Sequence, residues 1–159
     1  MPFVNIYFSL GSNLGDRRRN LTEAVERLEA ALGVPCAALS RFIETRAAGF
    51  SGGKFLNAAV LYRIPAESPL WTLYMIKSIE REMGRMDPPE YDSEGKRVYH
   101  SRIIDIDILF YGREIIDIPE LTIPHKGIAD RPFVMVPLRQ IARRSLRDAF
   151  PEYFKKLNK

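Results

Sequence analysis

The order of the apolar patterns along the chain constrains its fold more than any other feature. Residues 4–10 alternate apolar and polar side chains, which predicts a half-buried strand that ends at "GSNLGD". A helix should follow, with Asp16 as its N-cap and Gly33 at its end. Two further strands are predicted around residues 39–46 and 54–64, joined by a segment rich in Ala and Gly.

The next part of the pattern completes a known unit. Ser68 and Pro69 should open a helix that ends at Gly84, and after a polar stretch the apolar residues 103–111 predict a fourth strand. Strand, helix, two strands, helix, strand is the order of the ferredoxin-like α+β unit. We therefore predict an antiparallel sheet core with helices packed on it.

A hairpin and a C-terminal helix are predicted beyond this unit. Gly112 should turn the fourth strand into residues 113–118, which would form a hairpin arm. Residues 121–133 are expected to form a loop that leads into a helix over about residues 133–143. No repeat, low-complexity tract or linker interrupts the 159 residues, which indicates one domain.

Composition and charge limit the class of protein. The net charge is +4, and residues 126–159 carry nine Lys or Arg against three Asp or Glu. This basic end either attracts an anion or covers a helix surface with solvated side chains. Cys36 is the only cysteine, so no disulfide can form within the chain and a reducing, cytoplasmic location is expected. The first residues do not resemble a signal peptide and no apolar run reaches the roughly 18 residues of a membrane span, so no membrane partner is expected.

The glycine-rich segment "SLGSNLGD" lies between a predicted strand and a predicted helix, where some nucleotide-binding proteins hold phosphate. It has neither the G-x-x-x-x-G-K-[ST] spacing nor the G-x-G-x-x-G spacing. A tight turn with a helix cap is therefore the better interpretation.

Two aspartates within the apolar strand 103–111 are the candidate chemical site. Side chains at i and i+2 of a strand lie on one face about 6.6 Å apart, so Asp105 and Asp107 should point the same way. Ile104 and Ile106 should fill the opposite face. Carboxylate oxygens suit Mg²⁺, and two such ions could share this pair beside a substrate phosphate. An isolated pair could equally be the solvated face of a strand.

Cationic residues near the pair favour phosphate chemistry. Arg102 precedes Asp105, and the loop that follows the hairpin contains His125, Lys126 and Arg131. Phosphoryl transfer needs such donors, because its transition state spreads negative charge over oxygens that must be positioned and stabilised. Any one of these side chains could simply be solvated, but together they indicate a phosphoryl-transfer site.

Five segments resemble one family in order along the chain: "GSNLGD", "FLNAAV", "IEREMGR", "SRIIDIDILFYG" and "LTIPHKGIADRPFVMVPL". The chain is similar to the 6-hydroxymethyl-7,8-dihydropterin pyrophosphokinases of folate biosynthesis. The resemblance implies one pyrophosphokinase domain over residues 1–159. The protein would be a monomer and would bind no nucleic acid. The resemblance also implies two small-molecule substrates, ATP and the hydroxymethyl dihydropterin, with Mg²⁺ as cofactor. The pyrophosphoryl group of ATP would pass to the pterin hydroxyl, with release of AMP.

The resemblance also assigns roles to individual residues. Asp105 and Asp107 would be the ligands of two Mg²⁺ ions, with Arg102 and Arg97 as further catalytic residues. Asn57 would recognise the pterin edge, and Phe133 would stack on its ring. The pterin side would comprise Thr45, Phe55, Asn57, Tyr99 and Phe133, and the nucleotide side Lys77, Glu80, Arg85, Arg102, Thr122, His125, Lys126 and Arg131.

Some positions depart from the family pattern. Tyr99 stands where a Trp is usual, and "TRAAG" replaces a segment with two prolines near the pterin. Lys77 replaces a common Gln. The polar loop 86–101, which should close over ATP as a lid, offers only Lys96 and Arg97 as cations.

Two other functions fit part of the pattern. An RNA-binding module shares the ferredoxin-like topology, but "GKFLNAAVLY" offers only Phe55 where such a module needs several strand aromatics. An acid pair on a central strand would also repel RNA phosphates unless a metal lay between them. A two-metal nuclease is supported by Asp105 and Asp107 alone. Both alternatives are weaker than pyrophosphoryl transfer.

Overall fold

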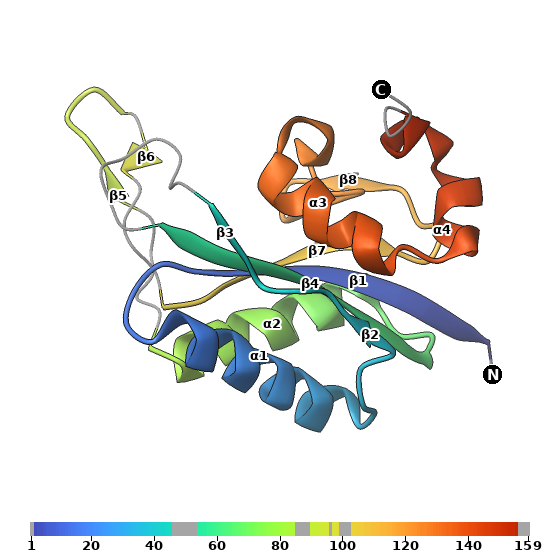
Figure 1. Ribbon diagram of the computed structural model, residues 1–159. Coiled ribbons are helices and arrows are strands. Elements are labelled where there is room, and N and C mark those ends of the chain that lie inside the picture. The colour runs from blue at the N-terminus through green and yellow to red at the C-terminus, as the bar shows by residue number, and fades with distance from the viewer. Residues whose placement is uncertain (1, 46–53, 85–89, 96, 99–102, 156–159) are drawn as a thin grey trace.

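A five-stranded sheet lies between two layers of helices (Figure 1). The computed structural model describes residues 2–45, 54–84, 90–95, 97–98 and 103–155. The helices are α1 (Arg17–Leu32), α2 (Pro69–Glu82), α3 (Pro132–Ile141) and α4 (Arg144–Ala149), with 3-10 turns η1 (Ile128–Asp130) and η2 (Pro151–Tyr153). The strands are β1 (Phe3–Ser12), β2 (Ala38–Leu39), β3 (Ile43–Thr45), β4 (Phe55–Pro65), β5 (Glu90–Tyr91), β6 (Arg97–Val98), β7 (Asp105–Tyr111), β8 (Ile116–Ile118) and β9 (Leu121–Ile123).

The main sheet has the strand order β2-β4-β1-β7, with β3 also paired to β4, and its pairs are antiparallel. This arrangement confirms the predicted ferredoxin-like α+β core. The strand expected around residues 39–46 is divided into β2 and β3. At the division, the backbone N–H of Arg41 donates to Gln140 Oε1 of α3, at 2.8 Å.

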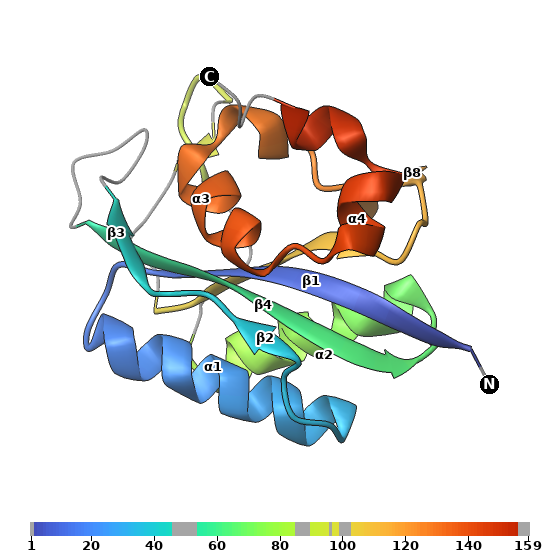
Figure 2. The same cartoon turned by 45° about the vertical axis from the view of Figure 1, so that its right-hand side comes forward.

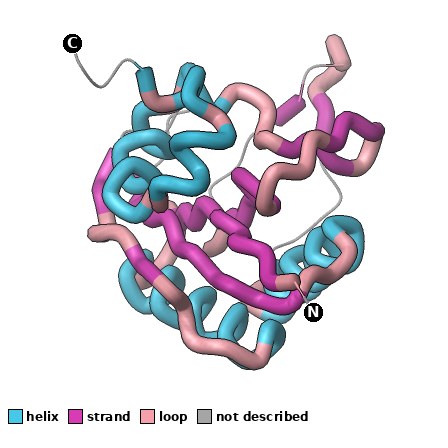
Figure 3. The backbone as a smooth tube through the Cα atoms, turned by 90° about the vertical axis from the view of Figure 1, so that its right-hand side faces the viewer, coloured by secondary structure: helices cyan, strands magenta, loops and turns pink. Residues whose placement is uncertain are grey.

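The two faces of the sheet have separate apolar cores. Ile6, Phe8 and Leu10 of β1 point toward α1 and α2, whereas Tyr7 lies in the core on the side of α3 and α4. Figures 2 and 3 show these helix pairs on opposite sides of the strands. Residues at alternate positions of each strand therefore face either α1 and α2 or α3.

The predicted caps of the first two helices are confirmed at Asp16, Gly33 and Ser68, whereas α2 ends at Glu82, two residues before the predicted Gly84. The Asp16 side chain accepts from the backbone N–H of Arg19 at 3.1 Å, and Gly33 ends α1 with a left-handed φ of 77°. Ser68 caps α2 by accepting from the backbone N–H of Trp71 at 3.3 Å. No helix among the described residues is long and apolar enough to cross a membrane.

The predicted hairpin arm has a different partner. Residues 116–118 form β8, which pairs with β9 and not with β7. One edge of β7 is occupied by β1, and on its other side the Ile106 N–H is bonded to Glu80 of α2. The predicted loop 121–133 therefore begins with a strand and contains η1, and the helix after it begins at Pro132.

A second hairpin forms in the polar stretch that precedes β7. β5 pairs with β6, and the Asp92 side chain accepts from the Glu94 N–H at 2.9 Å in the turn between them. Asp and Gly at such spacing are turn residues, so the signal was present in "DSEG". Half of the loop 86–101, which is expected to act as a lid, lies outside the described residues.

Candidate active site

The acid pair lies on the face of the sheet that α3 covers. In the register of the sheet, Gly11 of β1 is opposite Asp105 on one side and Asn57 of β4 on the other. Asn57, Gly11 and Asp105 thus form one row across three strands. Asp107 is two residues further along β7, and both aspartates are half-buried, while Ile106 between them is buried on the opposite face.

Asn57 is held in one orientation by a neighbouring strand. Its Nδ2 donates to Thr45 Oγ1 of β3 at 2.7 Å, and the residue is only 4% exposed. Phe55, two residues earlier on β4, is half-buried on the same face. The predicted pterin-side residues Thr45, Phe55 and Asn57 are therefore brought together.

Gly11 supplies the space that the Asn57 amide occupies. A Cβ atom at this position would lie 3.2 Å from Asn57 Oδ1 and 3.5 Å from the Phe55 ring. Its φ is not among the positive values found in the described chain, so the backbone does not require glycine here. Sequence reasoning placed Gly11 in a turn, but it belongs to β1. A glycine inside an alternating strand is the signal of such a close approach.

His125 contacts the acid pair from the segment after β9. Its Nε2 lies 3.6 Å from Asp107 Oδ1, and its backbone N–H donates to the carbonyl of Leu109 at 3.0 Å. The neighbouring Asp107 carboxylate raises the pKa of His125, although burial and the charge of Arg131 oppose this shift. The ring N–H of an imidazole at this position is a donor of the kind that binds phosphate oxygens.

The start of α3 adds an aromatic ring to the same face. Phe133 is half-buried against the core beneath α3, which packs on β3 and β4. The Arg131 guanidinium lies 5.9 Å from the centroid of that ring. Two other predicted nucleotide-side residues belong to the chain segment before α3: Thr122 lies on β9, and Lys126 is exposed.

The predicted residues of α2 are placed differently. Glu80 is fully buried, and its Oε2 accepts from the backbone N–H of Ile106 at 2.7 Å. Lys77 Nζ lies 3.6 Å from Glu80 Oε1. The Glu80 side chain thus contacts the backbone of β7 at Ile106, between the two aspartates. It does so from the face of the sheet that α1 and α2 cover.

Four predicted residues cannot be compared with this geometry. Arg85, Tyr99 and Arg102 lie outside the described residues, as does the side chain of Arg97 on β6. Their roles stay predictions from the resemblance.

The acid pair fits magnesium better than a structural transition metal. Within the described ranges, no three His, Cys, Asp or Glu side chains are grouped so that they could hold a metal ion. Mg²⁺ commonly takes one or two carboxylates and fills its other positions with water and substrate phosphates, whereas structural zinc needs four protein ligands. Two half-buried carboxylates that share a face are therefore a magnesium-type donor set.

Comparison with known proteins identifies the family. Residues 7–143 match the family model described as 7,8-dihydro-6-hydroxymethylpterin-pyrophosphokinase (HPPK). The chain belongs to this family. It is a pyrophosphokinase of folate biosynthesis, a diphosphotransferase that acts on small-molecule substrates, as its sequence predicted.

Similar proteins with known names agree with the HPPK assignment. The 2-amino-4-hydroxy-6-hydroxymethyldihydropteridine pyrophosphokinase of Porphyromonas gingivalis is 44% identical over 139 residues, covering 86% of this chain and 90% of that one. The enzyme of the same name from Bacillus subtilis is 33% identical, with 90% and 81% covered. A folate synthesis bifunctional protein of Arabidopsis thaliana is 39% identical over 86% of this chain, which spans 26% of that protein.

Solved structures show the same fold. An HPPK-DHPS crystal structure in complex with substrates superposes with a TM-score of 0.64 at 15% identity, covering 96% of this chain and 44% of that one. The Plasmodium falciparum HPPK-DHPS structure with pteroate also gives a TM-score of 0.64 at 15% identity, and this chain covers 42% of it. The chain therefore corresponds to one part of these longer proteins.

Proposed function

We propose that this HPPK transfers the pyrophosphoryl group of ATP to 6-hydroxymethyl-7,8-dihydropterin and releases AMP, with Mg²⁺ held by Asp105 and Asp107. One observation carries the proposal: Asn57 and the acid pair lie on one face of the sheet, with Asn57, Gly11 and Asp105 in a row across three strands. Adjacent strands are about 4.8 Å apart, so the backbones of Asn57 and Asp105 are about 10 Å apart. A bicyclic ring with its hydroxymethyl group can bridge this distance.

The side chains of the site would divide the work between the two substrates. Asn57, held by Thr45, would form hydrogen bonds with the donors and acceptors along the edge of the pterin. Phe133 would pack on the flat face of the pterin ring. His125, Lys126 and Arg131 would bind the triphosphate, and the resemblance adds Lys77, Glu80, Arg85, Arg102 and Thr122 on that side. Bound Mg²⁺ would neutralise charge on the phosphate oxygens.

Positioning accounts for most of the chemistry we propose. Holding the pterin hydroxyl near the β-phosphorus of ATP converts a bimolecular encounter into a unimolecular transfer, and no covalent enzyme intermediate is needed. Arg97 and Arg102 would stabilise the charge that develops on the phosphates, and Tyr99 would offer a second stacking face.

The organisation of the protein is also a proposal. We expect residues 1–159 to act as one pyrophosphokinase domain and the protein to be a cytoplasmic monomer. Its partners would be ATP and the pterin, and it would bind neither nucleic acid nor a membrane. A single molecular weight across a concentration series in analytical ultracentrifugation would support the monomer, and concentration-dependent mass would contradict it.

The reaction products test the function directly. The protein, ATP, Mg²⁺ and the hydroxymethyl dihydropterin are incubated together, and nucleotides are separated by anion-exchange chromatography. We expect AMP in amounts equal to the pterin diphosphate, with the reaction abolished by EDTA. ADP as the product would refute pyrophosphoryl transfer, and full activity in EDTA would refute the magnesium site.

Gly11→Ala tests the pterin side of the site. The added methyl group would lie 3.2 Å from Asn57 Oδ1, so the amide must turn or shift. We expect the KM for the pterin to rise roughly tenfold, about 1.4 kcal/mol of binding, while the KM for ATP stays within about twofold. Steady-state kinetics with each substrate varied in turn gives both constants. An unchanged pterin KM would mean that the Asn57 amide does not contact the pterin.

A further inference from the structure

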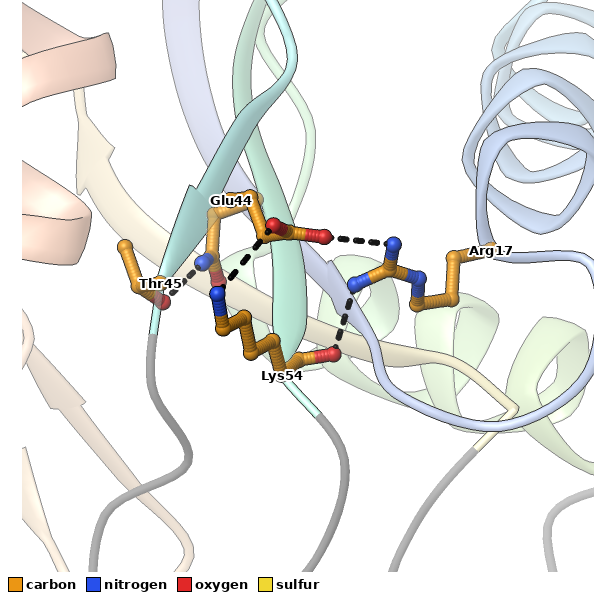
Figure 4. A network of polar contacts seen from close by, with 5 residues as sticks. Arg17, Glu44, Thr45 and Lys54 are labelled. Atoms are coloured by element: carbon orange, nitrogen blue, oxygen red, sulfur yellow. Dashed lines mark hydrogen bonds and ion pairs between the residues drawn. The ribbon is translucent and has the colours of Figure 1, made fainter.

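Three charged residues outside the proposed site form a connected network beside it (Figure 4). Arg17, the first residue of α1, has its Nη2 2.6 Å from Glu44 Oε2 of β3. Its Nη1 donates to the carbonyl of Lys54, the residue before β4, at 2.8 Å. Lys54 Nζ lies 3.8 Å from Glu44 Oε1. This clamp of Arg17, Glu44 and Lys54 therefore joins the start of α1 to β3 and β4.

The clamp acts on a short strand. β3 has three residues, which pair with β4 as Ile43 with Asn57, Glu44 with Leu56 and Thr45 with Phe55. Because side chains alternate along a strand, Glu44 points toward the clamp while Thr45 points to the opposite face, where it accepts from Asn57. Any shift of β3 along or away from β4 would thus move Thr45 relative to the Asn57 amide.

We propose that Arg17 and Glu44 are positioning residues for pterin recognition. They fix β3 against β4, so that Thr45 holds the Asn57 amide in the orientation that reads the pterin edge. This inference rests on the proposed function, because it assigns the Asn57 amide to the pterin. Arg17 suits the task, since the rigid planar guanidinium donates to a carboxylate and a carbonyl at once from two of its nitrogens. The Arg17 guanidinium also holds the pKa of the Glu44 carboxyl below its ordinary value.

The clamp should affect the pterin more than the fold. The side chains of Arg17 and Glu44 are 31% and 45% exposed, and exposed ion pairs add little to global stability. A local effect is different, because the described ladder between β3 and β4 is only three residue pairs long. We therefore expect a selective loss of pterin binding.

Variants that remove each charge test this inference. Arg17→Gln and Glu44→Gln should each raise the KM for the pterin by roughly fivefold, and the double variant should be no worse than either single one, as expected for one shared interaction. The KM for ATP and kcat should stay within about twofold, since neither residue touches the acid pair. Arg27→Gln is the matched control, because Arg27 lies on the same helix and pairs with Glu23 at 2.8 Å and Glu82 at 3.0 Å. It should leave all three constants unchanged.

A second measurement does not depend on turnover. In ¹⁵N-labelled protein, the side-chain amide signals of Asn57 should shift in Arg17→Gln and Glu44→Gln but not in Arg27→Gln. Unshifted signals, or KM values for ATP and pterin that rise together, would overturn the positioning role. A wild-type protein that makes no AMP would instead refute the proposed function, and the amide signals would still decide whether the clamp positions Asn57.

Discussion

Asp107→Ala is expected to lower kcat at least about 100-fold while the protein stays folded. The Asp107 side chain is 37% exposed, and the residues on either side of it on β7 are buried on the opposite face. Its loss therefore leaves no large cavity. Metal-assisted charge stabilisation is worth several kcal/mol, and about 1.4 kcal/mol corresponds to tenfold in rate. The rate of AMP formation and the thermal unfolding midpoint together measure the effect.

A matched variant separates the loss of a ligand from the loss of a charge. Asp148→Ala removes the same group from α4, where Asp148 is exposed and pairs with Arg144 at 3.7 Å. We expect normal kinetics from this control. If Asp107→Ala remained folded with near-normal turnover, the acid pair would have no part in the reaction.

Glu80→Ala is expected to reduce both stability and turnover. The buried Glu80 carboxylate accepts from the backbone N–H of Ile106, and its removal would leave that donor without this partner, at a cost of about 1–3 kcal/mol. Because Ile106 lies between the two aspartates, a looser strand should also misplace them and lower kcat by about tenfold or more. Chemical denaturation and steady-state kinetics measure the two effects.

Glu80→Gln distinguishes two roles for this residue. The resemblance puts Glu80 on the nucleotide side, whereas its observed contact is with the strand. Glutamine keeps an acceptor oxygen but loses the charge, so a strand-positioning role predicts stability and kcat close to those of the wild type. Equal loss of kcat in both variants, with stability kept in Glu80→Gln, would point to a role for the charge at the nucleotide.

Local sequence was sufficient where the controlling contacts are local. Asp16, Gly33 and Ser68 mark helix ends because caps involve backbone groups only a few positions away. The common face of Asp105 and Asp107 follows from the period of two in a strand. The order of these elements was enough to predict the ferredoxin-like core, and the motifs carried the family.

Only the tertiary structure decided what lies opposite these elements. The partner of β8, the space beside Gly11 and the bond from Ile106 to Glu80 all depend on which strands are neighbours and where the helices pack. The pair of Arg17 and Glu44 likewise joins residues 27 positions apart. Periodicity predicts which face of an element a side chain occupies, but not which residues it contacts there. Sequence alone therefore determined the main elements of the core and the acid pair, while folding determined the contacts that hold the candidate site in place.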